Sequence, residues 1–211
     1  SYTDGHGTAE AVTSSATAAV ANLNDAPTGA VTISGTATQG QTLTAANTLA
    51  DADGLGAITY QWLAGGSAIA GATASTLVLG EAQVGKAISV RASYTDGHGT
   101  AEAKASDPTS LVANLNDEPT GSVTITGTPT QGQTLTASNT LGDADGLGTI
   151  AYQWRADGTT IAGATTDTLV LGEAQVGKSI TVTASYTDGH GTAESVTSGP
   201  TTPVFNVNDA P

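Results

Sequence analysis

The sequence predicts an all-β protein made of small β-sandwiches that follow one another along an extended chain. Three observations predict this fold class. A unit of 92 residues recurs, each full unit divides into about seven short strand-like segments, and no stretch has the pattern of a long helix.

The repeat is visible in the order of the residues. The segment Ser-Tyr-Thr-Asp-Gly-His-Gly begins at Ser1, Ser93 and Ser185, a constant step of 92 residues. Residues 24–115 align with 116–207 without a gap, and 67 of the 92 positions are identical. This length suits one small independent domain. The sequence therefore predicts four parts, and we expect them to be a segment of a longer protein: residues 1–21 as the C-terminal strands of a preceding repeat, full repeats at 22–115 and 116–207, and the start of a further joint at 208–211.

The first full repeat opens with two strand patterns. Residues 30–34 alternate between apolar and polar side chains, which predicts the first strand. The turn at 39–41 separates it from a second strand that begins at 42–45. Residues 51–56, Asp-Ala-Asp-Gly-Leu-Gly, form a loop whose glycines permit positive φ.

The third strand carries the large aromatic residues. Ile58, Tyr60 and Trp62 share one face of it by the two-residue period of a strand. A glycine turn at 65–66 follows, and residues 68–70 form a short extended piece. We predict that these aromatic side chains pack in the core, because aromatic residues make up 4% of the chain and leave few for an exposed carbohydrate platform.

The second half of the repeat ends in a hairpin. Residues 76–79 predict another strand and residues 81–85 a single helical turn. Alternating apolar residues at 88–94 predict a strand with one buried face, and Asp-Gly-His-Gly at 96–99 predicts a tight turn. The last strand is expected to run from Thr100 to Val112.

About seven strands with turn signals every 8–12 residues are typical of a sandwich of immunoglobulin type. Trp62 and Trp154 stand where such folds bury a tryptophan on the third strand. The chain has no cysteine, so the disulfide of antibody domains is absent.

Composition narrows the function. The net charge is -14, from 19 acidic and 5 basic residues, so the chain offers no basic surface for nucleic acid. No apolar run is long enough for membrane insertion, and no nucleophile elbow, phosphate loop or zinc-protease motif is present, so we expect no enzyme. Carboxylates without thiolates favour a hard cation such as calcium.

The acidic residues gather in three places in each repeat. Acidic joints occupy 22–27, 114–119 and 206–211, an Asp-Ala-Asp loop follows the second strand, and an aspartate opens the last hairpin. Strand alternation brings these loops to one pole of a sandwich, and the turn with Glu81 lies at the opposite pole, which faces the next joint. The sequence thus predicts calcium ligands at Asn22, Asn24, Asp25, Asp51, Asp53, Glu81, Asp96, Asn114, Asn116, Asp117, Asp143, Asp145 and Asp188.

Alternatives to ligation stay open for these residues. Asp-Ala-Asp-Gly and Asp-Gly also favour turns, and Asn24 and Asn116 could cap backbone amides. Glu102 and Glu194 are expected to be solvated, and His98 and His190 are expected to be exposed at loop tips.

The joint, the Asp-Ala-Asp loop and the hairpin aspartate together resemble the calcium-binding elements of cadherin repeats. The whole chain resembles the tandem immunoglobulin-like or cadherin-like (VCBS-type) repeats of giant bacterial RTX adhesins that type I systems secrete. The resemblance implies an extracellular, cell-surface extender that holds an adhesive tip away from the cell, with roles in adhesion and biofilms. The joint begins with Asn rather than Asp, which implies fewer ions per joint than in classical cadherins.

Two rival functions belong to other classes. The repeats themselves could bind a glycan, ice or a protein, or they could self-assemble laterally into a fibre or surface layer. Residues 1–21 bear on the second rival, because an isolated edge strand is a template for pairing with another molecule.

Overall fold

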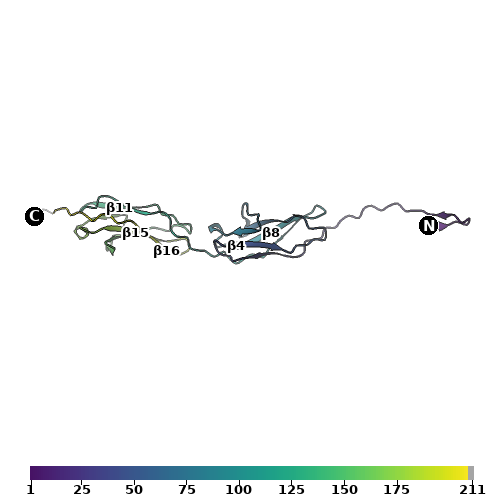
Figure 1. Cartoon of the computed structure of the whole chain (residues 1–211), viewed down its shortest axis with the longest axis horizontal. Coiled ribbons are helices and arrows are strands. Elements are labelled where there is room, and N and C mark those ends of the chain that lie inside the picture. The colour runs from purple at the N-terminus through teal and green to yellow at the C-terminus, as the bar shows by residue number, and fades with distance from the viewer. Residues whose placement is uncertain (209–211) are drawn as a thin grey trace.

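The computed structural model describes residues 1–208 and shows an elongated all-β chain (Figure 1). Two β bodies lie in line, and a long extended segment leads from them to a small N-terminal hairpin. Within the described residues, the helical elements are two single 3₁₀ turns, η1 (Glu81–Gln83) and η2 (Glu173–Gln175). The predicted joint at 206–211 ends in residues 209–211, which lie outside the described part.

Each body contains two antiparallel sheets. In the first body, one sheet has the order β3 (Val31–Ser34), β4 (Thr42–Asn47), β7 (Thr76–Val78), and the other β6 (Ser67–Ala68), β5 (Thr59–Ala64), β8 (Ile88–Thr95), β9 (Ala101–Ala105). In the second body, the same orders recur as β10 (Val123–Thr126), β11 (Thr134–Asn139), β14 (Thr168–Val170) and as β13 (Thr159–Thr160), β12 (Ala151–Ala156), β15 (Ile180–Thr187), β16 (Ala193–Thr197).

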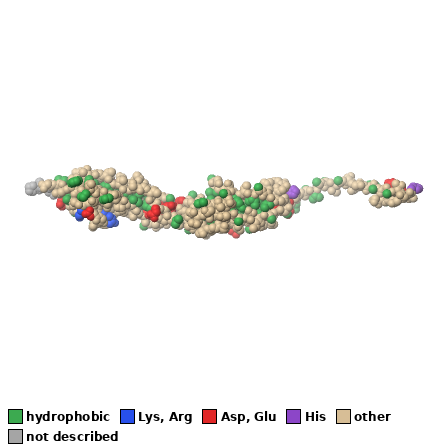
Figure 2. Space-filling model, viewed as in Figure 1, with side chains coloured by type: hydrophobic (Ala, Val, Ile, Leu, Met, Phe, Trp, Pro, Cys, Tyr) green, Lys and Arg blue, Asp and Glu red, His purple; other side chains and the backbone are tan. Residues whose placement is uncertain are grey.

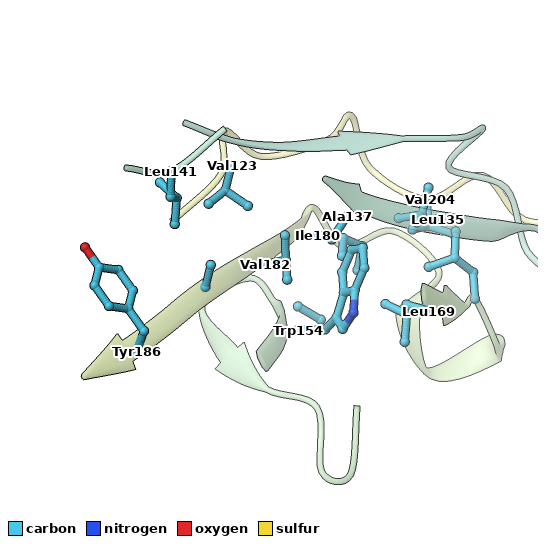
Figure 3. Close-up of a cluster of buried hydrophobic side chains, with 13 residues drawn as sticks. Val123, Leu135, Ala137, Leu141, Trp154, Leu169, Ile180, Val182, Tyr186 and Val204 are labelled. Carbon is cyan, nitrogen blue, oxygen red and sulfur yellow. The ribbon is translucent and has the colours of Figure 1, made fainter. Parts of the chain in front are cut away.

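The two sheets of each body share one apolar core. Trp154 is fully buried among residues of both sheets, and Figure 3 shows it beside Ala137 and Leu169. Its indole Nε1–H donates to the carbonyl of Thr166 at 2.8 Å, so the polar end of the ring is satisfied. Trp62 repeats this arrangement in the first body, which confirms the predicted core position of both tryptophans.

The strand that precedes the last hairpin shows the predicted alternation. Ile88, Val90, Ala92 and Tyr94 are buried, whereas the residues between them face outward. Its register with β5 sets Trp62 opposite Val90, so the largest core side chain lies at the centre of the sheet.

The last strand is shorter than predicted. We expected one strand over 100–112, but the regular strand β9 ends at Ala105, and isolated bridges follow at Leu111, Val112 and Ala113. Pro108 lies in the interruption, and proline has no N–H to donate to a ladder.

The N-terminal segment is almost wholly exposed. It forms the two-stranded hairpin of β1 (Tyr2–Thr3) and β2 (Ala9–Glu10) and then runs on without regular structure. Val20 is 97% exposed, whereas Val112, its counterpart 92 residues later, is 2% exposed in the core. Among the described residues, no helix is long and apolar enough to cross a membrane.

A close backbone approach requires glycine at the end of the Asp-Ala-Asp loop in each body. A Cβ on Gly148 would lie 2.0 Å from the carbonyl oxygen of Thr187, and Gly56 meets Thr95 in the same way. This contact brings the Asp-Ala-Asp loop against the end of β15, where the last hairpin begins.

We therefore predict that Gly148→Ala destabilises the second body by about 1–3 kcal/mol, the usual cost of forcing extra atoms into a packed site. Calorimetry should show one unfolding transition moving to lower temperature. Gly199→Ala is the matched control, because its Cβ would meet no atom within 4 Å. Equal transitions for the two variants would contradict the prediction.

Candidate metal centre

The middle joint, residues 114–119, lies where the two bodies meet, and Figure 2 shows acidic side chains gathered there. Two loops of the second body form one side of it. The Asp-Ala-Asp loop is shaped by Asp143 Oδ1, which accepts from the N–H of Asp145 at 2.9 Å. The hairpin loop is shaped by Asp188 Oδ1, which accepts from the N–H groups of His190 and Thr192 at 2.9 and 2.7 Å.

The two loops are joined through their backbones. The N–H of Gly189 donates to the carbonyl of Asp145 at 3.0 Å. A Cβ on Gly189 would lie 2.5 Å from that oxygen, so glycine is needed for the approach. The aspartates of both loops are thereby held side by side.

Hydrogen bonds fix the charge states of this pole. The phenol of Tyr186 donates to Asp143 Oδ2 at 2.6 Å, and burial together with this carboxylate raises the pKa of Tyr186. Burial acts to raise the pKa of Asp188, but the hydrogen bonds from Thr192, His190 and Gly191 outweigh it and lower that pKa. The hairpin loop therefore stabilises the charged form of Asp188.

The joint itself is bound to this pole by two contacts. The N–H of Asp117 donates to Asp145 Oδ2 at 2.8 Å, and Asn116 Nδ2 donates to Glu194 Oε1 at 2.8 Å. We expected Glu194 to be solvated; it is half-buried, and the strand after the hairpin carries its carboxylate to the joint, where it also accepts from Asn116.

The first body reaches the joint with two side chains. Gln39 donates from Nε2 to Asp117 Oδ2 at 2.7 Å and accepts from the N–H of Leu115 at 3.1 Å. Glu81 Oε1 lies 3.2 Å from Nε2 of His190. This hydrogen bond raises the pKa of His190. The residue is exposed at the hairpin tip, as expected, but its ring contacts Glu81.

Several oxygen atoms of this joint have no partner. Asp145 is 4% exposed and Asp188 is 7% exposed, yet one oxygen of each carboxylate makes no hydrogen bond. Within residues 1–208, the buried oxygens of this joint that lack a partner are Glu81 Oε2, Asn114 Oδ1, Asp145 Oδ1 and Asp188 Oδ2. Each such atom costs about 1–3 kcal/mol, and more if charged, unless something compensates it.

The first joint has the same internal contacts. The N–H of Asp25 donates to Asp53 Oδ2 at 2.8 Å, Asn24 Nδ2 donates to Glu102 Oε1 at 2.7 Å, and Tyr94 donates to Asp51. Asp96 Oδ2 is buried without a partner there, whereas Asn22 is exposed and precedes the cluster.

The structure thus brings most of the predicted residues together at two poles. Sequence reasoning missed Gln39, His190 and Glu194 as neighbours of the middle joint. The strict 92-residue period was the available signal for Gln39, because Gln131 repeats it and accepts from the N–H of Val207 at 3.1 Å.

Comparison with known proteins identifies no family for this chain and gives only weak structural similarities. No protein-family model matches the chain, and no curated protein matches it significantly. The three N-terminal domains of the highly immunogenic outer capsid protein (Hoc) of bacteriophage RB49 are 19% identical over 81% of this chain and 58% of that chain, with a TM-score of 0.29. A structure titled "Ca2+-stabilized adhesin helps an Antarctic bacterium reach out and bind ice" is 16% identical over 87% of this chain and 50% of that chain, with a TM-score of 0.33.

The chain therefore spans between half and three fifths of the length of these two structures. Both TM-scores lie below 0.5, so neither similarity bears on what this chain binds.

We predict that Gln39→Ala loosens the middle joint even when metal ions are chelated, because two hydrogen bonds worth about 0.5–1.5 kcal/mol each are lost. Spin labels on Val78→Cys and Val170→Cys, both exposed positions, would report the distance between the bodies by double electron–electron resonance. The distance distribution should broaden.

Gln131→Ala is the matched control, because it makes the same substitution at the far end of the second body. It should leave the distribution between the labels unchanged. If Gln39→Ala also leaves the width unchanged, the glutamine does not hold the joint.

Proposed function

We propose that this chain is an extender segment of a bacterial surface adhesin, and that calcium bound at the joints between repeats stiffens it. The observation that supports this most is the set of unpartnered buried oxygens at the middle joint, which comes from two repeats and the joint between them. An ion there links one body to the next.

Calcium suits the donor set better than other common ions. It takes 6–8 oxygen ligands at about 2.3–2.6 Å and accepts carboxylates, amide oxygens and carbonyls in irregular geometry. The middle joint offers these types of oxygen. The proposed ligands are Glu81, Asn114, Asn116, Asp117, Asp143, Asp145 and Asp188, with Asn22, Asn24, Asp25, Asp51, Asp53 and Asp96 at the first joint.

The residues of the joint have separate tasks in this proposal. Asp117 N–H holds one oxygen of Asp145 and so turns the other toward the ion site. The backbone of the hairpin does the same for Asp188. Glu81 supplies the upstream charge, and bound calcium neutralises the repulsion among these carboxylates, which would otherwise separate the bodies.

The finer features of the proposal follow from the resemblance of the sequence. The bodies are seven-stranded immunoglobulin-like or cadherin-like sandwiches of the VCBS type, with repeats at 22–115 and 116–207, in a protein of the RTX adhesin class that is exported to the cell surface. Extracellular modules bind calcium with dissociation constants of about 10⁻⁴–10⁻³ M. Calcium is scarce inside the cell and abundant outside it, so the joints stay flexible before export and stiffen after it. The two sheets around one core in each body support the sandwich.

We predict that calcium narrows the distance distribution between labels on Val78→Cys and Val170→Cys and raises the melting temperature. At a concentration one hundred times the dissociation constant, mass action adds about 2.7 kcal/mol to stability. Asp145→Asn combined with Asp188→Asn should abolish both effects at the middle joint, because the substitutions remove negative charge and keep the side-chain shape.

The matched control is Asp53→Asn combined with Asp96→Asn, the same changes at the first joint. In that variant, calcium should still narrow the distance between the labels. If the distance distribution and melting temperature of the unaltered chain are the same in calcium as in chelator, the extender proposal fails. The alternative to test is then that isolated repeats bind a partner.

A further inference from the structure

The structure gathers a nitrogen ligand with two carboxylates at the middle joint. A carboxylate oxygen of Glu81, a carboxylate oxygen of Asp145 and a ring nitrogen of His190 all lie within 4.8 Å of one another. Glu81 comes from the 3₁₀ turn of the first body, Asp145 from the loop after β11, and His190 from the hairpin between β15 and β16. The three side chains meet only because the two bodies abut.

An independent observation shows that this group is incomplete. Asp145 is 4% exposed, its Oδ2 is held by the N–H of Asp117, and its Oδ1 has no partner among the described residues. Glu81 Oε2 is likewise buried without a partner. A protonated His190 supplies one positive charge, which leaves the pair of carboxylates with a net negative charge and an unsatisfied oxygen each.

We propose that the middle joint also binds a divalent first-row transition-metal ion, through Nε2 of His190 and the carboxylates of Glu81 and Asp145. Imidazole is a common ligand of zinc, copper, iron and nickel, whereas calcium and magnesium take oxygen. One histidine with two carboxylates therefore favours a borderline ion over calcium. This inference rests on the proposed function only in that both use Glu81 and Asp145.

The geometry requires modest movement. Ligand atoms about 2.1 Å from a tetrahedral ion lie about 3.4 Å apart. His190 Nε2 and Glu81 Oε1 already lie 3.2 Å apart. The side chains of both residues are about one third exposed, so they have room to rotate toward the fixed carboxylate of Asp145.

The first joint provides an internal comparison. His98 is the counterpart of His190, and its Nε2 lies 3.9 Å from Asp53 Oδ1, but among residues 1–208 no third histidine or carboxylate completes a metal-binding group with them. The chain is also well suited to a test, because it has no cysteine and three histidines.

The test is a calorimetric titration of the untagged chain with zinc, for the unaltered protein, His190→Gln and the matched control His98→Gln. We expect one zinc ion per chain. His190→Gln should weaken zinc binding by at least about tenfold, because even the loss of a residue that only hydrogen-bonds a metal ligand typically weakens binding by that factor. His98→Gln should bind zinc as the unaltered chain does. Equal zinc affinity in the two variants would overturn the proposal.

A second measurement locates the ion. Cobalt(II) added to isotope-labelled protein should cause paramagnetic shifts that decrease with distance from His190 and should leave the amides around His98 unshifted. Shifts spread over the acidic surface, without a centre at the middle joint, would contradict the site.

Calcium titration of the same variants separates this inference from the proposed function. His190→Gln should retain the calcium response of the unaltered chain. Loss of zinc affinity in His190→Gln without any calcium binding would leave the transition-metal site standing and remove the calcium proposal. Calcium binding with identical zinc affinity in all three chains would do the reverse.

Discussion

Negative charge that is buried without hydrogen-bond donors is the constraint on which the middle joint depends. Backbone N–H groups of the joint and of the hairpin donate to one oxygen of Asp145 and one of Asp188, and the other oxygen of each carboxylate has no partner. Such atoms are costly in a low-dielectric contact, and like charges a few ångströms apart add repulsion. The cation binding proposed for the joint would offset both costs.

Two kinds of interaction hold the bodies together. Gln39 binds the joint through neutral and charge-assisted hydrogen bonds that need no ion, and it reaches backbone and carboxylate with the two ends of one amide. Glu81 meets the opposite body through its hydrogen bond with His190, which becomes an ion pair when the imidazole is protonated. The hydrogen bonds of Gln39 fix the path of the joint. The contact between Glu81 and His190 depends on the charges of the two side chains, and therefore on pH and on the ions in solution.

The sequence predicted what depends on period and alternation. Buried positions such as Ile88 and Tyr94, the core tryptophans and the meeting of the acidic loops at one pole follow from two-residue alternation and strand order. The early end of the last strand could have been predicted from Pro108, because proline cannot donate a backbone hydrogen bond within a strand. The contact between His190 and Glu81 could not be predicted, because it depends on how closely two bodies approach, which local patterns do not encode.

Each repeat holds halves of two different joints. Gln39 and Glu81, at one end of the first body, serve the joint ahead, and Gln131 and Glu173 stand in the same places of the second. The aspartates at the other end serve the joint behind. A gene could therefore gain or lose whole 92-residue units by recombination, and every remaining junction would still receive both of its halves. The length of the repeat array would then change in steps of one unit, without the need for any new contact between repeats.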